Sequence, residues 1–326
     1  MDIARRAAAL LVLPLLAACG ATEAEAGGDL TKVTFNLAWF PQGSLGGVFA
    51  AIDQGYYKEE GLSVEPVRGY GGTRTVNEID QGQFDYGYAD PISVILNRAK
   101  KGGTVMVGAL NTVWPGGLCY DAGKRTVDDL AGLKGLVLGG GSTSPIQSLL
   151  PVWLARNGLP ADHIKIIKMD PAVIDSALVQ GKIDLSDCWA GSNRATVLDL
   201  AKKAGKQIKW LDYRDHNLDM YGNGIVTSAD RLQKDPEQVR KFLRATYKGY
   251  AYMKANPDEV VGIIAKKYPE MNREVLASQV GDMNTLIGDG KGLFDEARMK
   301  STAEIIGTAF KVDVPATDVY TNDYLK

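Results

Sequence analysis

The chain has few of the residues that most often carry catalysis or bind metals. Its 326 residues include two histidines and three cysteines, which leaves little material for a zinc site or a disulfide scaffold. The nucleophile and metalloprotease motifs G-x-S-x-G, S-x-x-K and H-E-x-x-H do not occur. We therefore predict no catalytic residue, no resident cofactor and no bound metal.

The chain also lacks an excess of charge of one sign. Its 37 basic and 39 acidic residues give a formal net charge of −2, which argues against electrostatic binding to nucleic acid. The composition, with 45% hydrophobic and 23% charged residues, is that of an ordinary globular protein. The length is sufficient for two packed domains.

No long hydrophobic run occurs after residue 18, and the hydrophobic run that ends there is short. Arg5 and Arg6 precede apolar residues 7–18, fewer than the roughly 20 that a membrane-spanning helix needs. This pattern is typical of a secretory signal peptide. The run ends in LAACG, which resembles a bacterial lipoprotein signal and implies removal of residues 1–18 and lipidation of Cys19. The alternative is an ordinary signal with a coincidental cysteine.

Residues 19–30 would then form a small, polar tether to the membrane. With Cys19 lipidated, Cys119 and Cys188 remain, and both lie at the ends of predicted strands. Export would permit a disulfide between them. The sequence leaves a bridge and two buried free thiols both open.

Apolar runs alternate with helical patterns over most of the chain. Strands are predicted at 32–38, 62–67, 84–89, 105–110, 135–138, 164–168 and 183–186, with helices between them. This alternation predicts an α/β protein with a mostly parallel sheet. The pattern restarts after residue 110, and from Pro236 it changes to helices. From these changes we predict a second α/β domain and additional C-terminal helices.

A glycine-rich segment, Gly139 to Pro145, follows a predicted strand and precedes a predicted helix. Glycines allow a ligand to approach the backbone, and free N–H groups at a helix start bind acceptors. We interpret it as an anchor for a small ligand. A plain strand–helix turn remains open, and a dinucleotide site is disfavoured because Ser144 replaces the third glycine. Gly69 to Thr73 and Ala89 to Ser93 have the same form, and Asp90 is a natural helix N-cap.

Aromatic residues gather in the predicted loops. Trp39 and Trp189 stand at strand ends beside glycine or proline, where an aromatic ring can form a pocket wall. Structural loop aromatics are the alternative.

The segment Trp39-Phe40-Pro41-Gln42, followed by AAIDQGYYKEEGLSVE at 50–65, resembles a known family. So do Gly82 to Gly87 and Gln180 to Asp184. The family is that of the solute-binding proteins of ABC importers, in the branch that binds sulfonates, taurine, nitrate and thiamine pyrimidine precursors and includes a fungal pyrimidine synthase. The resemblance implies a two-lobe periplasmic-binding-protein type II fold with a ligand cleft between the lobes. Lobe 1 would comprise residues 31–113 plus 224–326, and lobe 2 residues 114–223.

The family also implies ligand loops at defined positions. The implied ligand-binding residues are Trp39, Phe40, Gln42, Gly71, Gly72, Thr73, Asp90, Ser142, Thr143, Ser144, Trp189, Tyr221 and Asn223. We add Asp187, which like Asp90 would accept a hydrogen bond from an amino or amide group of the ligand. The fungal synthase needs a cysteine-rich loop and a donor histidine, whereas the corresponding segment here is Asp187-Cys188-Trp189-Ala190-Gly191. Binding is therefore expected rather than catalysis.

We expect a monomeric, lipid-anchored binding protein, periplasmic or at the cell surface, that delivers a solute to an ABC permease. Trp39 and Trp189 would sandwich a flat heterocycle such as a pyrimidine or related vitamin precursor. The alternative ligand is a small anion, namely an alkanesulfonate, taurine, nitrate or an aromatic carboxylate, held by Arg74 and Arg194. The alternative of a different class is an exported enzyme resembling the pyrimidine synthase.

Overall fold

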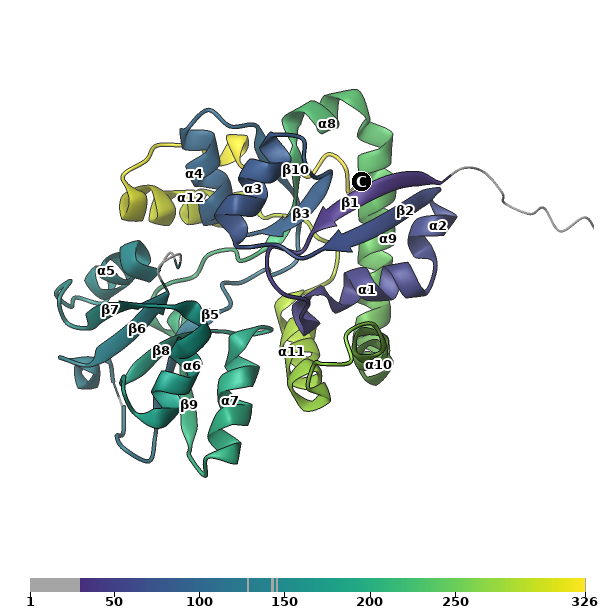
Figure 1. Cartoon of the computed structure of the whole chain (residues 1–326). Coiled ribbons are helices and arrows are strands. Elements are labelled where there is room, and N and C mark those ends of the chain that lie inside the picture. The colour runs from purple at the N-terminus through teal and green to yellow at the C-terminus, as the bar shows by residue number, and fades with distance from the viewer. Residues whose placement is uncertain (1–29, 128, 142–143, 145, 326) are drawn as a thin grey trace, which may run out of the picture.

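The computed structural model describes residues 30–127, 129–141, 144 and 146–325. Two lobes, each built on a five-stranded sheet, lie side by side (Figure 1). The predicted signal peptide, Cys19 and most of the tether lie outside the described residues. Within the described part of the chain, no helix is long and apolar enough to cross a membrane.

The first sheet has the strand order β2-β1-β3-β10-β4. Its strands are β1 (Thr31–Asn36), β2 (Leu62–Val67), β3 (Tyr86–Ala89), β4 (Thr104–Ala109) and β10 (Gly224–Ser228). Strands β1, β2 and β3 are parallel, whereas β10 runs antiparallel to both of its neighbours. Strands β3 and β4 therefore share one direction, and the sheet is mostly parallel as predicted. The exception is β10, which comes back from the second lobe and enters from the opposite end.

Helices cover both faces of the first sheet. They are α1 (Gly46–Asp53), α2 (Tyr56–Glu59), α3 (Gly72–Asp80), α4 (Pro91–Ala99), α8 (Ala229–Lys234), α9 (Pro236–Ala255), α10 (Pro257–Lys267), α11 (Arg273–Leu286) and α12 (Glu296–Phe310). Short 3-10 helices are η1 (Gly43–Leu45) and η4 (Ala316–Asp318). The C-terminal helices predicted after Pro236 are confirmed.

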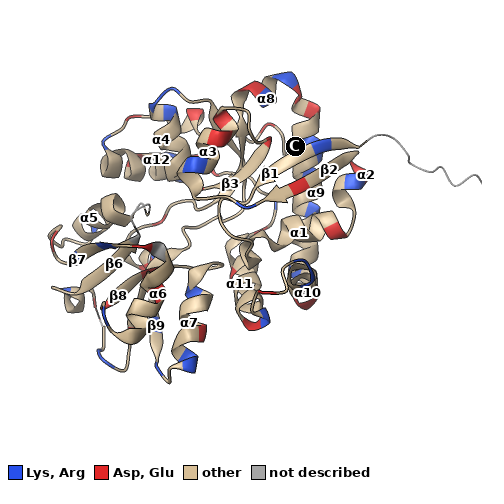
Figure 2. Cartoon of the chain, in the orientation of Figure 1, with Lys and Arg blue, Asp and Glu red and all other residues tan. Residues whose placement is uncertain are grey.

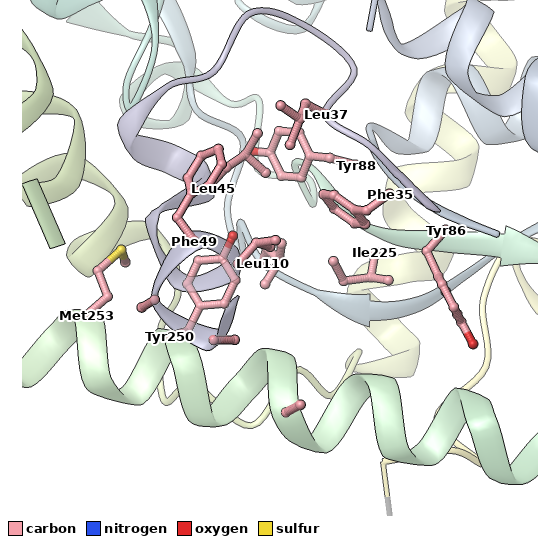
Figure 3. Packing of buried hydrophobic residues seen from close by; sticks show 14 of the residues in the cluster. Phe35, Leu37, Leu45, Phe49, Tyr86, Tyr88, Leu110, Ile225, Tyr250 and Met253 are labelled. Atoms are coloured by element: carbon pink, nitrogen blue, oxygen red, sulfur yellow. The ribbon is translucent and has the colours of Figure 1, made fainter. Parts of the chain in front are cut away.

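The core of the first lobe lies between its sheet and α9. Phe35 and Tyr86 of the sheet stack on Phe242 of α9, with ring centroids 6.0 and 3.9 Å apart. Figure 3 shows Tyr250 and Met253 of α9 facing Leu45, Phe49 and the sheet residues. Burying these large apolar side chains contributes about 1.5–3 kcal/mol for each one, which fixes α1 and η1 beneath the ligand loops.

The second sheet has the order β7-β6-β8-β5-β9. Its strands are β5 (Gly116–Asp121), β6 (Val137–Gly141), β7 (Lys165–Met169), β8 (Leu185–Trp189) and β9 (Ile208–Asp212). Its helices are α5 (Ile146–Arg156), α6 (Pro171–Gln180) and α7 (Asn193–Lys203), with η2 (Leu130–Leu133) and η3 (Tyr213–His216). Strand β5, which enters from the first lobe, is antiparallel to β8.

Two chain segments cross between the lobes, at about residues 110–115 and 219–224. They are bonded to each other, since the backbone N–H groups of Leu110 and Asn111 donate to Asn223 O and Gly222 N–H donates to Asn111 O. A Cβ on Gly222 would stand 2.7 Å from Pro115 and 2.8 Å from Asn111 Cβ, so the close crossing requires glycine there. Charged residues of both signs are interspersed over both lobes (Figure 2).

Candidate functional site

A cleft of about 1510 Å³ separates the two lobes. Its walls come from the loops that follow β1, β2 and β3 in the first lobe, from β8 and α7 in the second lobe, and from α11. Ligands of α/β proteins commonly bind at the carboxyl ends of parallel strands. The cleft therefore lies where the topology favours a ligand.

The first-lobe aromatics are presented by two interlocked loops. Ala38 has a φ of 60°, a conformation held by hydrogen bonds from Ala38 N–H to Asn36 Oδ1 at 2.9 Å and from Gly71 N–H to Ala38 O at 2.6 Å. A Cβ on Gly69 would stand 2.5 Å from Ala38 Cα, so the loops approach this closely only with glycine. The result is a fixed platform that carries Trp39 and Phe40.

The platform is exposed and lined by cations. Trp39 is 38% exposed and Phe40 is 48% exposed, and their rings meet edge to face at 5.7 Å. The Arg68 guanidinium lies 3.7 Å from the centre of the Phe40 ring and 4.8 Å from that of Tyr70. Large apolar faces left in water are available for stacking on a flat ligand.

Asp90 lies deeper in the cleft, at the N-terminus of α4. Its carboxylate accepts hydrogen bonds from Ser93 N–H at 2.8 Å and Ser93 Oγ at 2.9 Å, as a helix cap does. A Cβ on Gly72 would stand 2.5 Å from Asp90 Oδ2, so the start of α3 can approach the carboxylate only because residue 72 is glycine. Burial raises the pKa of Asp90 above its ordinary value.

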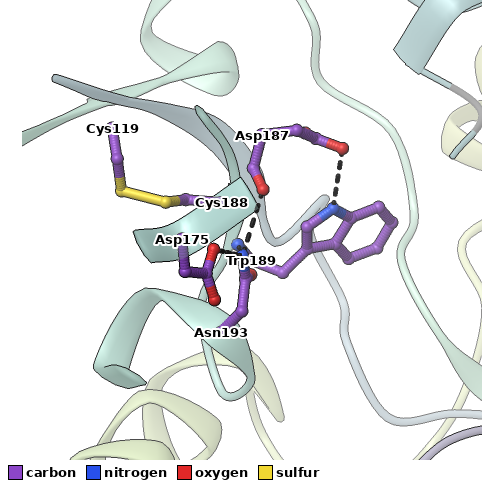
Figure 4. The surroundings of a disulfide bond; sticks show 6 residues. All are labelled: Cys119, Asp175, Asp187, Cys188, Trp189 and Asn193. Atoms are coloured by element: carbon purple, nitrogen blue, oxygen red, sulfur yellow. Dashed lines mark hydrogen bonds between the residues drawn. A yellow bond between two sulfur atoms is a disulfide. The ribbon is translucent and has the colours of Figure 1, made fainter. Parts of the chain in front are cut away.

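Asp187 and Trp189 form the second-lobe side of the cleft (Figure 4). Asp187 Oδ2 accepts hydrogen bonds from Ser144 Oγ at 2.8 Å and from Trp189 Nε1 at 3.3 Å. The Trp189 ring also packs on Trp114, with centroids 4.8 Å apart. Burial is the main cause that raises the pKa of Asp187 to about 6.

A third half-buried carboxyl group, Asp175 of α6, lies beside this pair. Asn193 Nδ2 donates to Asp175 Oδ1 at 3.0 Å and to the backbone oxygen of Asp187 at 3.2 Å, while Asn193 Oδ1 accepts from Trp189 N–H at 2.8 Å. Burial raises the pKa of Asp175 to about 6. One asparagine thus joins the Asp175 carboxyl group to the backbone of Asp187 and of Trp189.

The charges that line the cleft are mostly acidic, with six carboxyl groups and two cations among the described residues. The cations are Arg74 and Lys203, whose side chains are 60% and 63% exposed and which pair with Glu78 and Asp199. Arg194, the other predicted anion clamp, pairs with Asp282 and stacks on Trp210 at 5.0 Å. The described part of the site thus offers carboxyl acceptors, its two lining cations are paired and exposed, and Arg68 stacks on the platform.

Most of the predicted ligand residues meet at this cleft. They are Trp39, Phe40, Gln42, Gly71, Gly72, Thr73, Asp90, Ser144, Asp187, Trp189 and Asn223. Ser142 and Thr143 lie outside the described residues. Tyr221 does not face the cleft, because its ring packs on Phe294 at 5.2 Å and its hydroxyl accepts from Asp295 N–H at 2.7 Å.

The glycine-rich segment was interpreted as a loop that anchors a small ligand, and its first glycines do not have that role. Gly139 and Gly140 belong to β6 rather than to a loop. A Cβ on Gly139 would stand 2.6 Å from Ile183, so this glycine serves packing inside the lobe. Among the described residues of the segment, Ser144 is the one that lines the cleft.

Several cleft residues have no signal in the sequence. Tyr88, Asn111, Asp175, Asn193 and Gln279 line it as well. Asp175 and Gln279 lie within helices, and we had searched for ligand residues at the ends of predicted strands. Asn193 begins α7, a helix that the sequence pattern did not indicate.

Known proteins similar to this chain include binders and an enzyme. The model of the family described as NMT1/THI5 like matches residues 42–260. A formylaminopyrimidine-binding protein of Halalkalibacterium halodurans is 25% identical over 81% of this chain and 78% of that protein. A 4-amino-5-hydroxymethyl-2-methylpyrimidine phosphate synthase of Saccharomyces cerevisiae is 24% identical over 76% of this chain and 74% of that protein.

A solved structure shares the fold. The periplasmic aliphatic sulphonate binding protein SsuA from Escherichia coli superposes with a TM-score of 0.68 at 17% identity, covering 87% of each chain. The predicted two-lobe α/β fold of type II periplasmic binding proteins is thereby confirmed.

Proposed function

The chain belongs to the NMT1/THI5-like family, and on that premise we propose that it is the extracytoplasmic solute-binding protein of an ABC importer. Its solute is a flat heterocycle that bears amino groups, of the pyrimidine type. The protein captures the solute in the cleft between lobe 1 (residues 31–113 plus 224–326) and lobe 2 (residues 114–223) and delivers it to the permease. Cys19 carries the lipid anchor that keeps the protein at the membrane.

The observation that carries this proposal is the charge of the cleft beside its aromatics. Trp39 and Trp189 come from opposite lobes and supply ring faces, while Asp90 and Asp187 supply acceptors. A ring amino group donates hydrogen bonds to such carboxyl groups, and hydrogen bonds to charged groups are worth about 1.5–3 kcal/mol. A sulfonate or carboxylate would instead meet half-buried acids, with no unpaired cation among the described lining residues, which costs free energy.

Capture fits the site better than turnover. The segment 187–191 lacks the cysteine-rich loop and donor histidine expected of the synthase, and Cys188 is joined to Cys119. The cleft of about 1510 Å³ exceeds the roughly 300–1,000 Å³ of a typical small-molecule pocket. Closure of the lobes around the ligand, as a population shift, would reduce it.

A thermal-shift panel tests the proposal. Formylaminopyrimidine, 4-amino-2-methylpyrimidine, taurine, an alkanesulfonate and nitrate are each added to the purified protein. A ligand present at about 100 times its dissociation constant adds about 2.7 kcal/mol to stability. We expect the aminopyrimidines to raise the Tm, and Trp189→Ala to abolish the rise. The control is Leu198→Ala, which changes an exposed apolar residue of α7 and should leave the rise in Tm intact. A rise with anions alone would contradict the proposal.

A further inference from the structure

The turn that follows Trp189 is held by the other lobe. Ala190 packs against the core of the first lobe. Gly191 N–H donates to Asp282 Oδ2 of α11 at 2.8 Å, and Arg194 pairs with the same carboxylate. Helix α11 thus binds the turn at two points through one side chain.

A second residue of α11, one turn earlier, holds the same segment. Gln279 Nε2 donates to Ser192 O at 3.0 Å, and Gln279 Oε1 accepts from Gly43 N–H at 2.8 Å. Ser192 Oγ in turn donates to Gln42 Oε1 at 2.8 Å. Gln279 is 5% exposed and Gln42 is 8% exposed, so these bonds are shielded from competing water.

The anchored turn connects directly to the ligand-facing groups. Asn193 lies between Ser192 and Arg194, and its side chain bonds Trp189 N–H, Asp175 and the backbone of Asp187. Contacts therefore run without a break from α11, through residues 190–194, to the tryptophan and carboxyl groups of the cleft. Gln279 also lines the cleft, whereas Asp282 does not.

We infer that Asp282, assisted by Gln279, is a positioning residue that sets the placement of Trp189 and Asn193 and so couples α11 to ligand affinity. Two features of the geometry support this. The carboxylate of Asp282 neutralises Arg194, whose side chain is 24% exposed and stacks on Trp210. It also accepts the backbone N–H of Gly191, which has a φ of 76° and leaves only 3.3 Å between an added Cβ and Ser44.

Helix α11 also offers a matched control. Glu274 of α11 pairs with Lys202 of α7 at 3.3 Å, and both side chains are about three-quarters exposed, at 75% and 76%. Exposed pairs of this kind contribute little. Glu274→Gln therefore removes an acid and an ion pair between the same two helices without touching the turn at 190–194.

Backbone hydrogen exchange tests the inference without any ligand. In the purified wild-type protein, the amide of Gly191 is expected to exchange slowly. Asp282→Ala should accelerate exchange over residues 189–193 by about tenfold or more, because the bond lost is to a charged group. Asp282→Asn, which keeps an acceptor and removes the charge, should give an intermediate effect, and Glu274→Gln should give none. Unchanged exchange in Asp282→Ala would overturn the inference.

Ligand affinity supplies the second measurement, with formylaminopyrimidine as the probe. This part rests on the proposed function. Asp282→Ala should raise the Kd about tenfold while Glu274→Gln leaves it unchanged. Faster exchange with an unchanged Kd would overturn the positioning role. Failure of the wild-type protein to bind the probe would count against the proposed ligand, and the exchange measurement would still decide whether α11 anchors the turn.

Discussion

At the scale of single residues, the cleft contains carboxyl groups in surroundings that disfavour their charge. Asp187 has a pKa of about 6 because burial outweighs the hydrogen bonds from Ser144 and Trp189. Burial likewise raises the pKa of Asp175 to about 6. A protein gains no stability from such groups, and this is consistent with their retention for binding a donor-rich solute.

The sign of the Asp187 effect on stability follows from its raised pKa. Between about pH 4 and pH 6 the folded state holds more protons at Asp187, whose folded pKa is about 6, than does the unfolded chain. Stability therefore falls as the pH rises through this window. Above pH 6 the free-energy penalty of a negative charge on this half-buried side chain is present.

Replacing the acid by its neutral isostere should remove that penalty. We expect Asp187→Asn to raise the free energy of unfolding of the ligand-free protein by about 1–2 kcal/mol at pH 7.5. The difference should vanish near pH 4, where both side chains are neutral. Urea denaturation at the two pH values measures this, with the exposed Asp313→Asn as control. A variant equally or less stable than wild type at pH 7.5 would contradict the burial argument.

The same substitution should weaken capture. The amide side chain of the Asp187→Asn variant would keep a carbonyl acceptor but lose the charge, so the Kd for an aminopyrimidine should rise about tenfold. Calorimetric titration of the variant beside the wild-type protein measures this change.

At the scale of elements, the Cys119–Cys188 disulfide joins β5 to β8. Cys119 is directly opposite Ser186, so Cys188, two residues along, lies diagonally across on the same face of the sheet. Asp187 and Trp189 lie on the other side of β8 from the disulfide (Figure 4) and line the cleft. Of the two possibilities that the sequence left open, the structure has the bridge.

The disulfide should therefore matter to both stability and binding. It closes a segment with a sequence separation of 69 residues, for which loop entropy predicts a stabilisation of about 4 kcal/mol as an upper value. We expect the double variant Cys119→Ala/Cys188→Ala to lose about 2–4 kcal/mol in urea denaturation and to bind formylaminopyrimidine more weakly.

A control separates these two effects. Val197→Ala removes buried volume from the same apolar cluster behind β8 and leaves the bridge intact. It should lower stability while changing the Kd less than the double variant does. Equal affinities in wild type and double variant would show that the bridge does not brace the site.

Strands and helices with a clear hydrophobic pattern in the sequence were predictable. Strands whose place depends on how the chain passes between the lobes were not. Apolar runs located β1, β2 and β3, and the change of pattern at Pro236 located the C-terminal helices. No strand was predicted at β5, β9 or β10. β10 lies between β3 and β4 because the chain returns to the first lobe from the second, and no local pattern predicts that path.

The site was predictable where ligand residues follow strands. Trp39, Asp90 and Trp189 stand at strand ends, and the fold brings these ends together. Asp175 and Gln279 could not be found in this way, because helix residues reach the cleft only through the packing of α6 and α11. The prediction that Tyr221 lines the cleft is wrong, because the crossing segment turns the Tyr221 ring toward Phe294.

At the scale of the whole molecule, two lobes share a short hinge and an anchored turn. The crossing segments at 110–115 and 219–224 are bonded to each other, while α11 holds the turn after β8. These contacts tie the two lobes together, and Trp189 of the second lobe and the first-lobe platform line the same cleft. We expect the solute to bind by completing the contacts between these two walls.

The most direct test of solute capture is a calorimetric titration of the purified protein, followed by recovery of the ligand. We predict saturable, stoichiometric binding of formylaminopyrimidine, no binding of an alkanesulfonate, and return of the pyrimidine chemically unchanged by mass spectrometry. Binding of the alkanesulfonate alone would contradict the role given to the acidic cleft. Recovery of an altered pyrimidine would show that the protein is an enzyme rather than a carrier.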